Sequence, residues 1–162
     1  MGTEVVNPAM APAKLDVTAV IAAPQGLVMK AFFDAEALQA WWQASRSVTT
    51  PRVLGAYVIE WPPTDFRDDL LGRLGGVFRG TVMQCHAGEG FFVADAFWLP
   101  PDGDPIGPMA LDVSLKAEPG GATRVHVVQS GFEETPRWRR YYEVIGVGWE
   151  RALGSLKSLL EH

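Results

Sequence analysis

Several residue types and patterns are scarce or missing in this sequence, and each absence excludes a class of protein. The 162 residues include one cysteine, so no disulfide can form within the chain and no oxidising compartment is needed. Lysine and arginine number 14 against 19 acidic residues, and the net charge of -5 argues against nucleic acid or anionic lipid as a partner. No apolar run approaches the roughly 20 residues that span a bilayer, and residues 1–13 lack the pattern of a secretory signal. We therefore expect a cytoplasmic protein without membrane contact.

Motifs for metal, nucleotide and nucleophile chemistry are also missing. His86 lies beside Cys85, but neither CxxC nor HExxH occurs, so a zinc site is not expected. Asp102 and Asp104 fall far short of a calcium-binding loop. The sequence has no GxSxG, no P-loop and no GxGxxG. We expect no metal and no other cofactor.

The chain divides into a short arm and one α+β domain. Residues 1–13 contain two prolines and small side chains, which are typical of a flexible N-terminal arm. The domain covers residues 14–160, a length that allows a sizeable core. Residues 161–162 resemble the remnant of a purification tag, and no function is attributed to them.

Hydrophobic periodicity predicts strands over most of the domain. Residues 14–22 alternate between apolar and polar side chains, as a half-buried strand does. Pro24 and Asp34 then stand where two short helices can start. Further strands, separated by turns rich in glycine and proline, are predicted over residues 53–61, 76–85, 90–99, 109–117 and 122–130. Consecutive strands with short turns predict an antiparallel meander.

Beyond Pro136 the hydrophobic period changes from two to about 3.6. The pattern predicts one amphipathic helix over residues 137–159, about 36 Å long. Glycine costs a helix roughly 1 kcal/mol relative to alanine, so Gly146 and Gly148 indicate that space or close packing is needed in the middle. The predicted apolar stripe consists of Trp138, Tyr142, Ile145, Trp149, Leu153, Leu156 and Leu160.

A series of short motifs accompanies this order of elements. They are residues 28–33, Leu38, Trp41-Trp42, Gly55-Ala56-Tyr57, Phe78-Arg79-Gly80, Thr123, Ser130-Gly131-Phe132, Trp138, Gly148-Trp149, Leu153 and Leu156. In these motifs the chain resembles the activator-of-heat-shock-protein-ATPase homologue (AHSA-like) family of the START-like (SRPBCC, birch-pollen-allergen-like) superfamily. The resemblance implies the helix-grip fold, in which a curved antiparallel sheet with a six-strand meander wraps a long C-terminal helix and two short helices follow the first strand.

Two segments depart from the family pattern. Residues 62–75 form a longer and more acidic connection than this family leads us to expect. The strand over residues 90–99 carries Phe91-Phe92 and Phe97-Trp98 where a plainer, more polar strand is usual. Both departures should alter the mouth or the lining of a pocket.

The fold that the resemblance implies leaves a cavity between the sheet and the long helix. Six tryptophans, eight phenylalanines and three tyrosines could line such a cavity or simply fill the core. We expect a small hydrophobic or amphipathic molecule there, with one hydrogen bond from Tyr57 or Tyr142. The residues predicted to bind it are Trp41, Tyr57, Trp61, Phe78, Phe92, Trp98, Tyr142, Gly148 and Trp149.

Three kinds of function fit these observations. We favour a binding module without catalysis, which an apolar cavity lacking an ionisable group would support. The superfamily also contains enzymes of the cyclase or dehydratase type, which would use Asp95, Glu60 or Tyr57 as proton carriers in the same cavity. Asp95 would have to lie buried beside Phe91 rather than face solvent. A filled core with an exposed apolar patch would instead indicate a stress-related or co-chaperone-like interaction module. Whether the chain forms a homodimer is left open.

Overall fold

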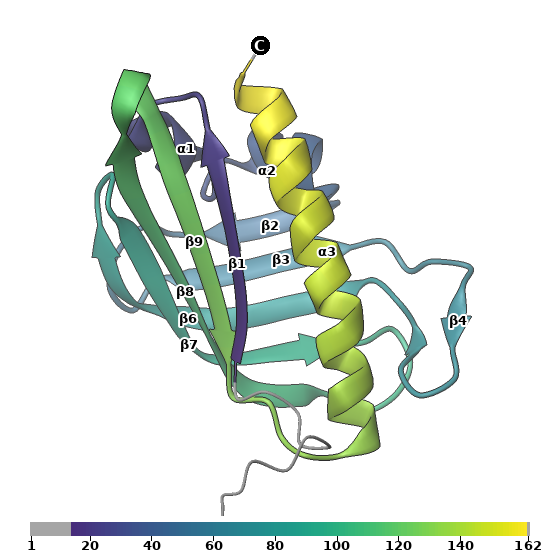
Figure 1. Ribbon diagram of the computed structural model, residues 1–162. Helices are drawn as coiled ribbons and strands as arrows, with labels where there is room; N and C mark the ends of the chain where they lie inside the picture. Colours follow the sequence, from purple (N-terminus) through teal and green to yellow (C-terminus); the bar gives the residue numbers. More distant parts are fainter. Residues whose placement is uncertain (1–13, 162) are drawn as a thin grey trace, which may run out of the picture.

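A seven-stranded antiparallel sheet curves around the long C-terminal helix in the computed structural model, which describes residues 14–161 (Figure 1). The elements are β1 (Lys14–Ile21), α1 (Gln25–Ala31), α2 (Ala35–Trp42), β2 (Arg46–Thr49), β3 (Ala56–Trp61), β4 (Arg67–Asp68), β5 (Gly72–Arg73), β6 (Gly76–His86), β7 (Gly90–Leu99), β8 (Ile106–Glu118), the 3-10 turn Pro119–Gly121, β9 (Ala122–Ser130) and α3 (Pro136–Leu160). The strand order β1-β9-β8-β7-β6-β3-β2 is a six-strand meander to which β1 is added through β9. The predicted helix-grip fold is confirmed.

The helix α3 runs unbroken through its central glycines, as predicted. The Thr135 side chain caps its first turn by accepting a hydrogen bond from the Trp138 backbone N–H at 3.2 Å. Pro136 lies in that first turn, where its missing N–H leaves no bond unmade. Figure 1 shows α3 lying beside β1 and crossing in front of β3 and β6. The helix therefore runs along the strand at one edge of the sheet and across the strands further in.

Two short helices close one end of the helix–sheet interface. The carboxylate of Asp34 accepts a hydrogen bond from the Ala37 N–H at 2.9 Å, which confirms it as the cap of α2. Pro24 directly precedes α1, also as predicted. Trp42, at the end of α2, lies against Trp149 of α3 with ring centroids 4.8 Å apart. The two helices therefore define where α3 can approach the sheet.

Beneath α1 lies a group of rings that we call the packed aromatic cluster: Phe32, Phe33, Tyr57 and Phe91. Neighbouring ring centroids are 4.8 to 5.6 Å apart, mostly in edge-to-face arrangements. Phe32 and Tyr57 are fully buried. The Tyr57 hydroxyl donates to the Phe32 carbonyl oxygen at 2.9 Å, so its one polar group is satisfied inside the core.

A bulge in β7 changes which residues face the core. Phe92 lies on the less buried face of the strand, because its neighbour Val93 points inward. At Asp95 the backbone enters the left-handed region, with φ 53°, and the pairing with β8 shifts register between Val93 and Ala96. Ala96 and Trp98 are then the buried residues. Phe92 and Trp98 therefore face opposite sides, although strict alternation would put them on the same side.

The structure also contains short elements that the sequence did not predict. The edge strand β2 has four residues and no strong apolar alternation. The hairpin β4–β5 has two residues in each strand and lies inside the long acidic connection. The arm expected over residues 1–13 lies outside the described residues. Within residues 14–161, no helix combines the length and apolar character needed to cross a membrane.

Candidate functional site

A cavity of about 1100 Å³ lies between α3, α2 and the concave face of the sheet. This volume lies just above the range typical of small-molecule sites, roughly 300–1,000 Å³. Its aromatic lining comes from α2, β3, β6, β7 and α3, namely Trp41, Trp42, Trp61, Phe78, Trp98, Tyr141 and Trp149. The middle of the helix–sheet interface is thus hollow and not filled.

The cavity brings together six of the nine residues that the sequence analysis assigned to ligand binding: Trp41, Trp61, Phe78, Trp98, Gly148 and Trp149. Gly148 is the clearest reason for the free space. A Cβ atom placed on it would meet no atom of another element within 4 Å, and the same holds for Gly154, about 1.7 turns further along the helix. That these six residues hold a ligand stays a prediction.

The other three predicted binding residues lie outside the lining, each for a physical reason. Tyr57 belongs to the packed aromatic cluster, with its hydroxyl bonded to Phe32. Phe92 faces the other side of the sheet because the bulge in β7 separates its orientation from that of Trp98. Tyr142 packs edge-on against Phe132, with ring centroids 5.1 Å apart. Neither Tyr57 nor Tyr142 supplies the hydrogen bond expected in the cavity.

The three proton carriers considered for an enzyme are also absent from the lining. Asp95 is exposed at the bulge. Glu60 binds Arg46 across β2 and β3, with an N–O distance of 2.8 Å, on a partly exposed face. Burial raises the pKa of Tyr57 far above its ordinary value. Among the described residues, neither a carboxylate nor a histidine lines the cavity.

The indole N–H groups of four lining tryptophans are already engaged. Three donate to backbone carbonyl oxygens and one to a side chain: Trp41 to Ala31 (2.9 Å), Trp61 to Trp42 (2.9 Å), Trp98 to Gly75 (2.7 Å) and Trp149 to Gln129 Oε1 (2.9 Å). These bonds fix the ring orientations. The rings therefore present mainly apolar faces and edges to the cavity.

Two buried polar residues of the lining were missed by the sequence analysis. Gln129 is fully buried on β9, and its Nε2 donates to the Tyr141 hydroxyl at 3.2 Å. The sequence did carry a signal, because Gln129 continues the inward alternation of Val125 and Val127. The sequence analysis chose Tyr142 in place of Tyr141. The two tyrosines lie four and three residues after Trp138, and both spacings fit a helical stripe.

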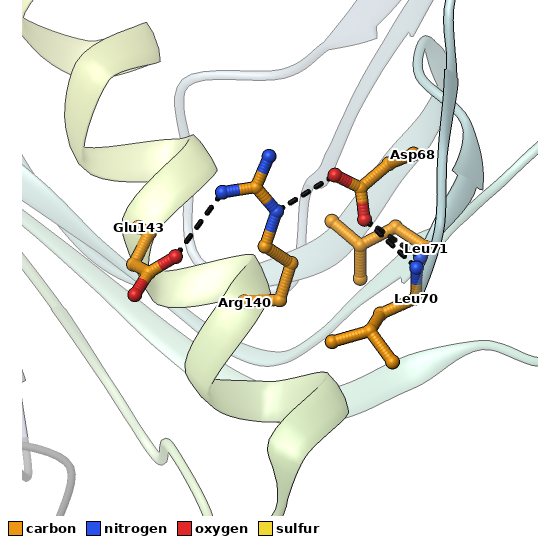
Figure 2. A network of polar contacts seen from close by, with 5 residues as sticks. All are labelled: Asp68, Leu70, Leu71, Arg140 and Glu143. Carbon is orange, nitrogen blue, oxygen red and sulfur yellow. Dashed lines mark hydrogen bonds and ion pairs between the residues drawn. The ribbon is translucent and has the colours of Figure 1, made fainter.

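The long acidic connection forms one wall of the cavity, as its departure from the family pattern predicted. Residues 62–75 contribute five residues to the lining, namely Pro62, Thr64, Leu71, Leu74 and Gly75. Figure 2 shows how this segment is fastened to α3 through the buried Asp68. One carboxylate oxygen accepts from Arg140 Nε at 2.7 Å, and the other accepts from the N–H groups of Leu70 and Leu71, each at 3.0 Å. We call this arrangement the Asp68–Arg140 latch.

The latch keeps Asp68 ionised. Burial alone would raise the pKa of Asp68, but the bond from Arg140 and the two backbone N–H groups outweigh it, and the pKa lies below its ordinary value. Arg140 also donates to Glu143 at 3.1 Å, and both carboxylates raise its pKa. At neutral pH the hairpin wall is therefore tied to the helix by a charged pair.

Comparison with known proteins places this chain in a family. The family profile described as activator of Hsp90 ATPase homolog 1-like protein matches residues 22–161. The chain belongs to this family. Its sequence has no significant match among curated proteins.

Solved structures of other proteins share the fold of this family member. MLL2253 from Mesorhizobium loti is 22% identical, with a TM-score of 0.69 over 91% of this chain and 96% of that one. CV1439 from Chromobacterium violaceum is 25% identical, with a TM-score of 0.66 over 93% and 99%. The Aha1 dimer from Colwellia psychrerythraea has a solution structure at 19% identity, with a TM-score of 0.65 over 93% and 97%.

In this family member the rim of the cavity is more polar than its interior. Gln43, Thr64 and Ser158 are exposed polar residues of the lining. Among the described residues that line the cavity, Arg151 alone is charged. Its guanidinium makes no hydrogen bond or ion pair with another described residue. An apolar interior with one cation at the mouth suits an amphipathic guest.

Proposed function

We propose that this family member binds a small, predominantly apolar molecule in the cavity and does not transform it. The observation that carries the proposal is the composition of the lining: a large aromatic space without a carboxylate or a histidine among the described residues. A general acid or base must lie within hydrogen-bonding reach of its substrate. Asp95, Glu60 and Tyr57 all lie elsewhere, so none of the proton carriers expected for the cyclase or dehydratase alternative lies in this site.

The energetics support binding without chemistry. Burying about 200 Å² of apolar ligand surface at ~25 cal/mol per Å² gives roughly 5 kcal/mol before the costs of association. The lining tryptophans are held by their own hydrogen bonds, so little ordering is needed when a guest enters. The site is thus preorganised for a guest with an apolar body.

Filling the cavity from α3 tests the proposal. The probe N-phenyl-1-naphthylamine should quench tryptophan fluorescence saturably in the wild type. Gly148→Leu places a side chain in the open space and should weaken this binding at least about tenfold, whereas Val147→Leu adds bulk to an exposed position on the same turn and should leave it unchanged. The absence of a saturable response in the wild type, or equal binding by the two variants, would refute the cavity as the binding site.

A second role has separate support on the outer surface. Val53, Leu54 and Met83 expose 52%, 68% and 42% of their surface, and Leu54 is held next to Met83 by its N–H bond to the Val82 carbonyl. We propose that this patch pairs with a second copy of the chain, a role that the dimeric Colwellia structure makes worth testing. Analytical ultracentrifugation should show a dimer that Leu54→Asn weakens, and a wild type that sediments only as a monomer would exclude it.

A further inference from the structure

The hydrogen bonds around Gln129 define the orientation of a buried amide. The indole of Trp149 can only donate, so the atom that accepts from it at 2.9 Å must be the amide oxygen of Gln129. The amide nitrogen then faces the opposite way, toward Met109 Sδ at 3.3 Å and the Tyr141 hydroxyl oxygen at 3.2 Å. Both amide protons are therefore used.

This orientation leaves the Tyr141 hydroxyl with a proton to donate. Its oxygen accepts from Gln129, and within residues 14–161 no group accepts a hydrogen bond from it. Tyr141 is 4% exposed, and burial raises the pKa of its hydroxyl, so the proton stays on the oxygen at neutral pH. A buried donor without an acceptor costs about 1–3 kcal/mol. Because Gln129 and Tyr141 both line the cavity, the missing acceptor is most simply part of what the cavity holds.

We propose that the ligand carries a neutral acceptor oxygen, of the ketone or other carbonyl type, that accepts a hydrogen bond from Tyr141 at the buried end of the cavity. This inference rests on the proposed binding function and narrows it to a class of ligand. It also assigns to Tyr141 the hydrogen bond that the sequence analysis expected from Tyr57 or Tyr142.

The surroundings of Tyr141 favour a neutral acceptor over an anion. Its ring contacts are Trp98, Phe132 and Trp138, and its polar contact is Gln129, so none of these groups carries a charge. The neighbouring Arg140 is occupied by Asp68 and Glu143. A buried carboxylate here would lose its hydration without gaining a cation. Arg151, the charged lining residue, is ten residues and thus about 15 Å further along α3.

The ring arrangement favours a flat body attached to that oxygen. Trp98 stacks on Tyr141 with ring centroids 5.3 Å apart and planes 24° apart, so each ring holds the other in place as part of one aromatic wall. Trp149 and Trp42 provide tilted faces nearby, with centroids 4.8 Å apart. Aromatic surfaces of this kind are well suited to planar rings. A planar ketone would satisfy both the rings and the hydroxyl.

Two probes of nearly equal shape test this directly. Fluorenone and fluorene are planar tricyclic molecules that differ by a carbonyl in place of a methylene group. In Tyr141→Phe the affinity for fluorenone should fall about fivefold, as expected for one neutral hydrogen bond, whereas fluorene binding should change less than about twofold. Tyr142→Phe removes the same atom from the adjacent residue outside the lining and should leave both affinities unchanged.

The carbonyl stretching frequency of bound fluorenone gives a second readout that does not depend on stability. It should lie at the hydrogen-bonded position in the wild type and shift to the free position in Tyr141→Phe. If both probes bind but neither affinity nor frequency responds to Tyr141→Phe, the acceptor is a water molecule, and the ligand class is wrong while the binding function stands. If neither probe binds the wild type, the inference and the proposed function fail together.

Discussion

The packed aromatic cluster and the cavity are built from the same kinds of side chain, yet one is solid and the other hollow. In both regions aromatic ring centroids lie about 5 Å apart, at 5.3 Å for Tyr57–Phe91 and 5.3 Å for Trp98–Tyr141. The two regions differ in the residues that pack opposite these rings. The end of α1 fills the first region with Phe32 and its neighbour, whereas α3 presents Gly148 to the second. Aromatic content alone does not reveal a cavity; glycine on the facing helix does.

The largest effects should come from truncating one ring in each region. Phe32→Ala and Trp149→Ala should each lower the free energy of unfolding by about 3–5 kcal/mol in urea titrations, because both side chains are buried. Only Trp149→Ala should also weaken binding of N-phenyl-1-naphthylamine, since only Trp149 lines the cavity. A loss under about 1 kcal/mol for either variant, or impaired binding by Phe32→Ala in its folded state, would break the distinction between the two regions.

An intermediate effect on the free energy of unfolding is expected from the Asp68–Arg140 latch. The four residues of the packed aromatic cluster have no equivalent ion pair. Asp68→Asn should destabilise the chain by about 1–2 kcal/mol at pH 7, a value reduced by the partial exposure of Arg140. The pKa of Asp68 is lowered in the folded chain, so the unfolded chain takes up the proton first as the pH falls. The stabilisation is fully present above the ordinary carboxyl value of about 3.9 and is lost as the pH falls from there through the lower pKa of the folded chain.

Unfolding titrations at pH 7 and pH 3 measure this dependence. The difference between wild type and Asp68→Asn should shrink at pH 3. Glu143→Gln, which removes an exposed partner of the same arginine, should cost less than about 0.5 kcal/mol at either pH. A difference between wild type and Asp68→Asn that stays constant with pH would mean that the carboxylate charge does not hold the hairpin wall.

The smallest effect should be at the mouth. Arg151→Gln should change the free energy of unfolding by less than about 0.5 kcal/mol, because the side chain is exposed. It should weaken binding of fluorenone-2-carboxylate about twofold to fivefold and leave fluorenone unaffected, and the effect should fade in high salt. Equal loss for both probes would show that Arg151 contributes packing and not charge.

The fold was predictable because its evidence is repeated along the chain. Alternation over β1, β8 and β9, and a 3.6-residue period over α3, each involve many residues, so an error at one position does not change the assignment. The short strand β2 and the hairpin β4–β5 were missed because two to four residues give too little pattern. Their formation depends on neighbours brought together by the tertiary structure.

The cavity was harder to predict because the orientation of single residues determines which side chains line it. Tyr57 is aromatic and lies in a strand, yet its partners in the packed aromatic cluster keep it from the lining. Tyr141 and Tyr142 differ by 100° around the helix, and the sequence pattern accommodates either. Gln129 was overlooked because the sequence analysis looked for apolar lining residues. Its hydrogen-bonding partners, Trp149 and Tyr141, are distant in sequence and gave no local signal. Hydrogen bonding and ring contacts across elements settle such positions.

The bulge at Asp95 lets one wall of the cavity tolerate a change of strand length as well as of residue identity. The position is exposed and left-handed, so Asp95→Asn or Asp95→Gly would preserve its geometry. Deletion of this one residue would remove the bulge and restore simple alternation, with Val93, Ala96 and Trp98 all still facing inward. Trp98 would then keep its bond to Gly75, which ties the acidic connection to the sheet. Descendants of this chain can therefore exchange or lose this residue and keep the wall of the proposed ligand site, whereas a β7 that kept all its residues but lost the bulge would turn Phe97 inward and Trp98 out.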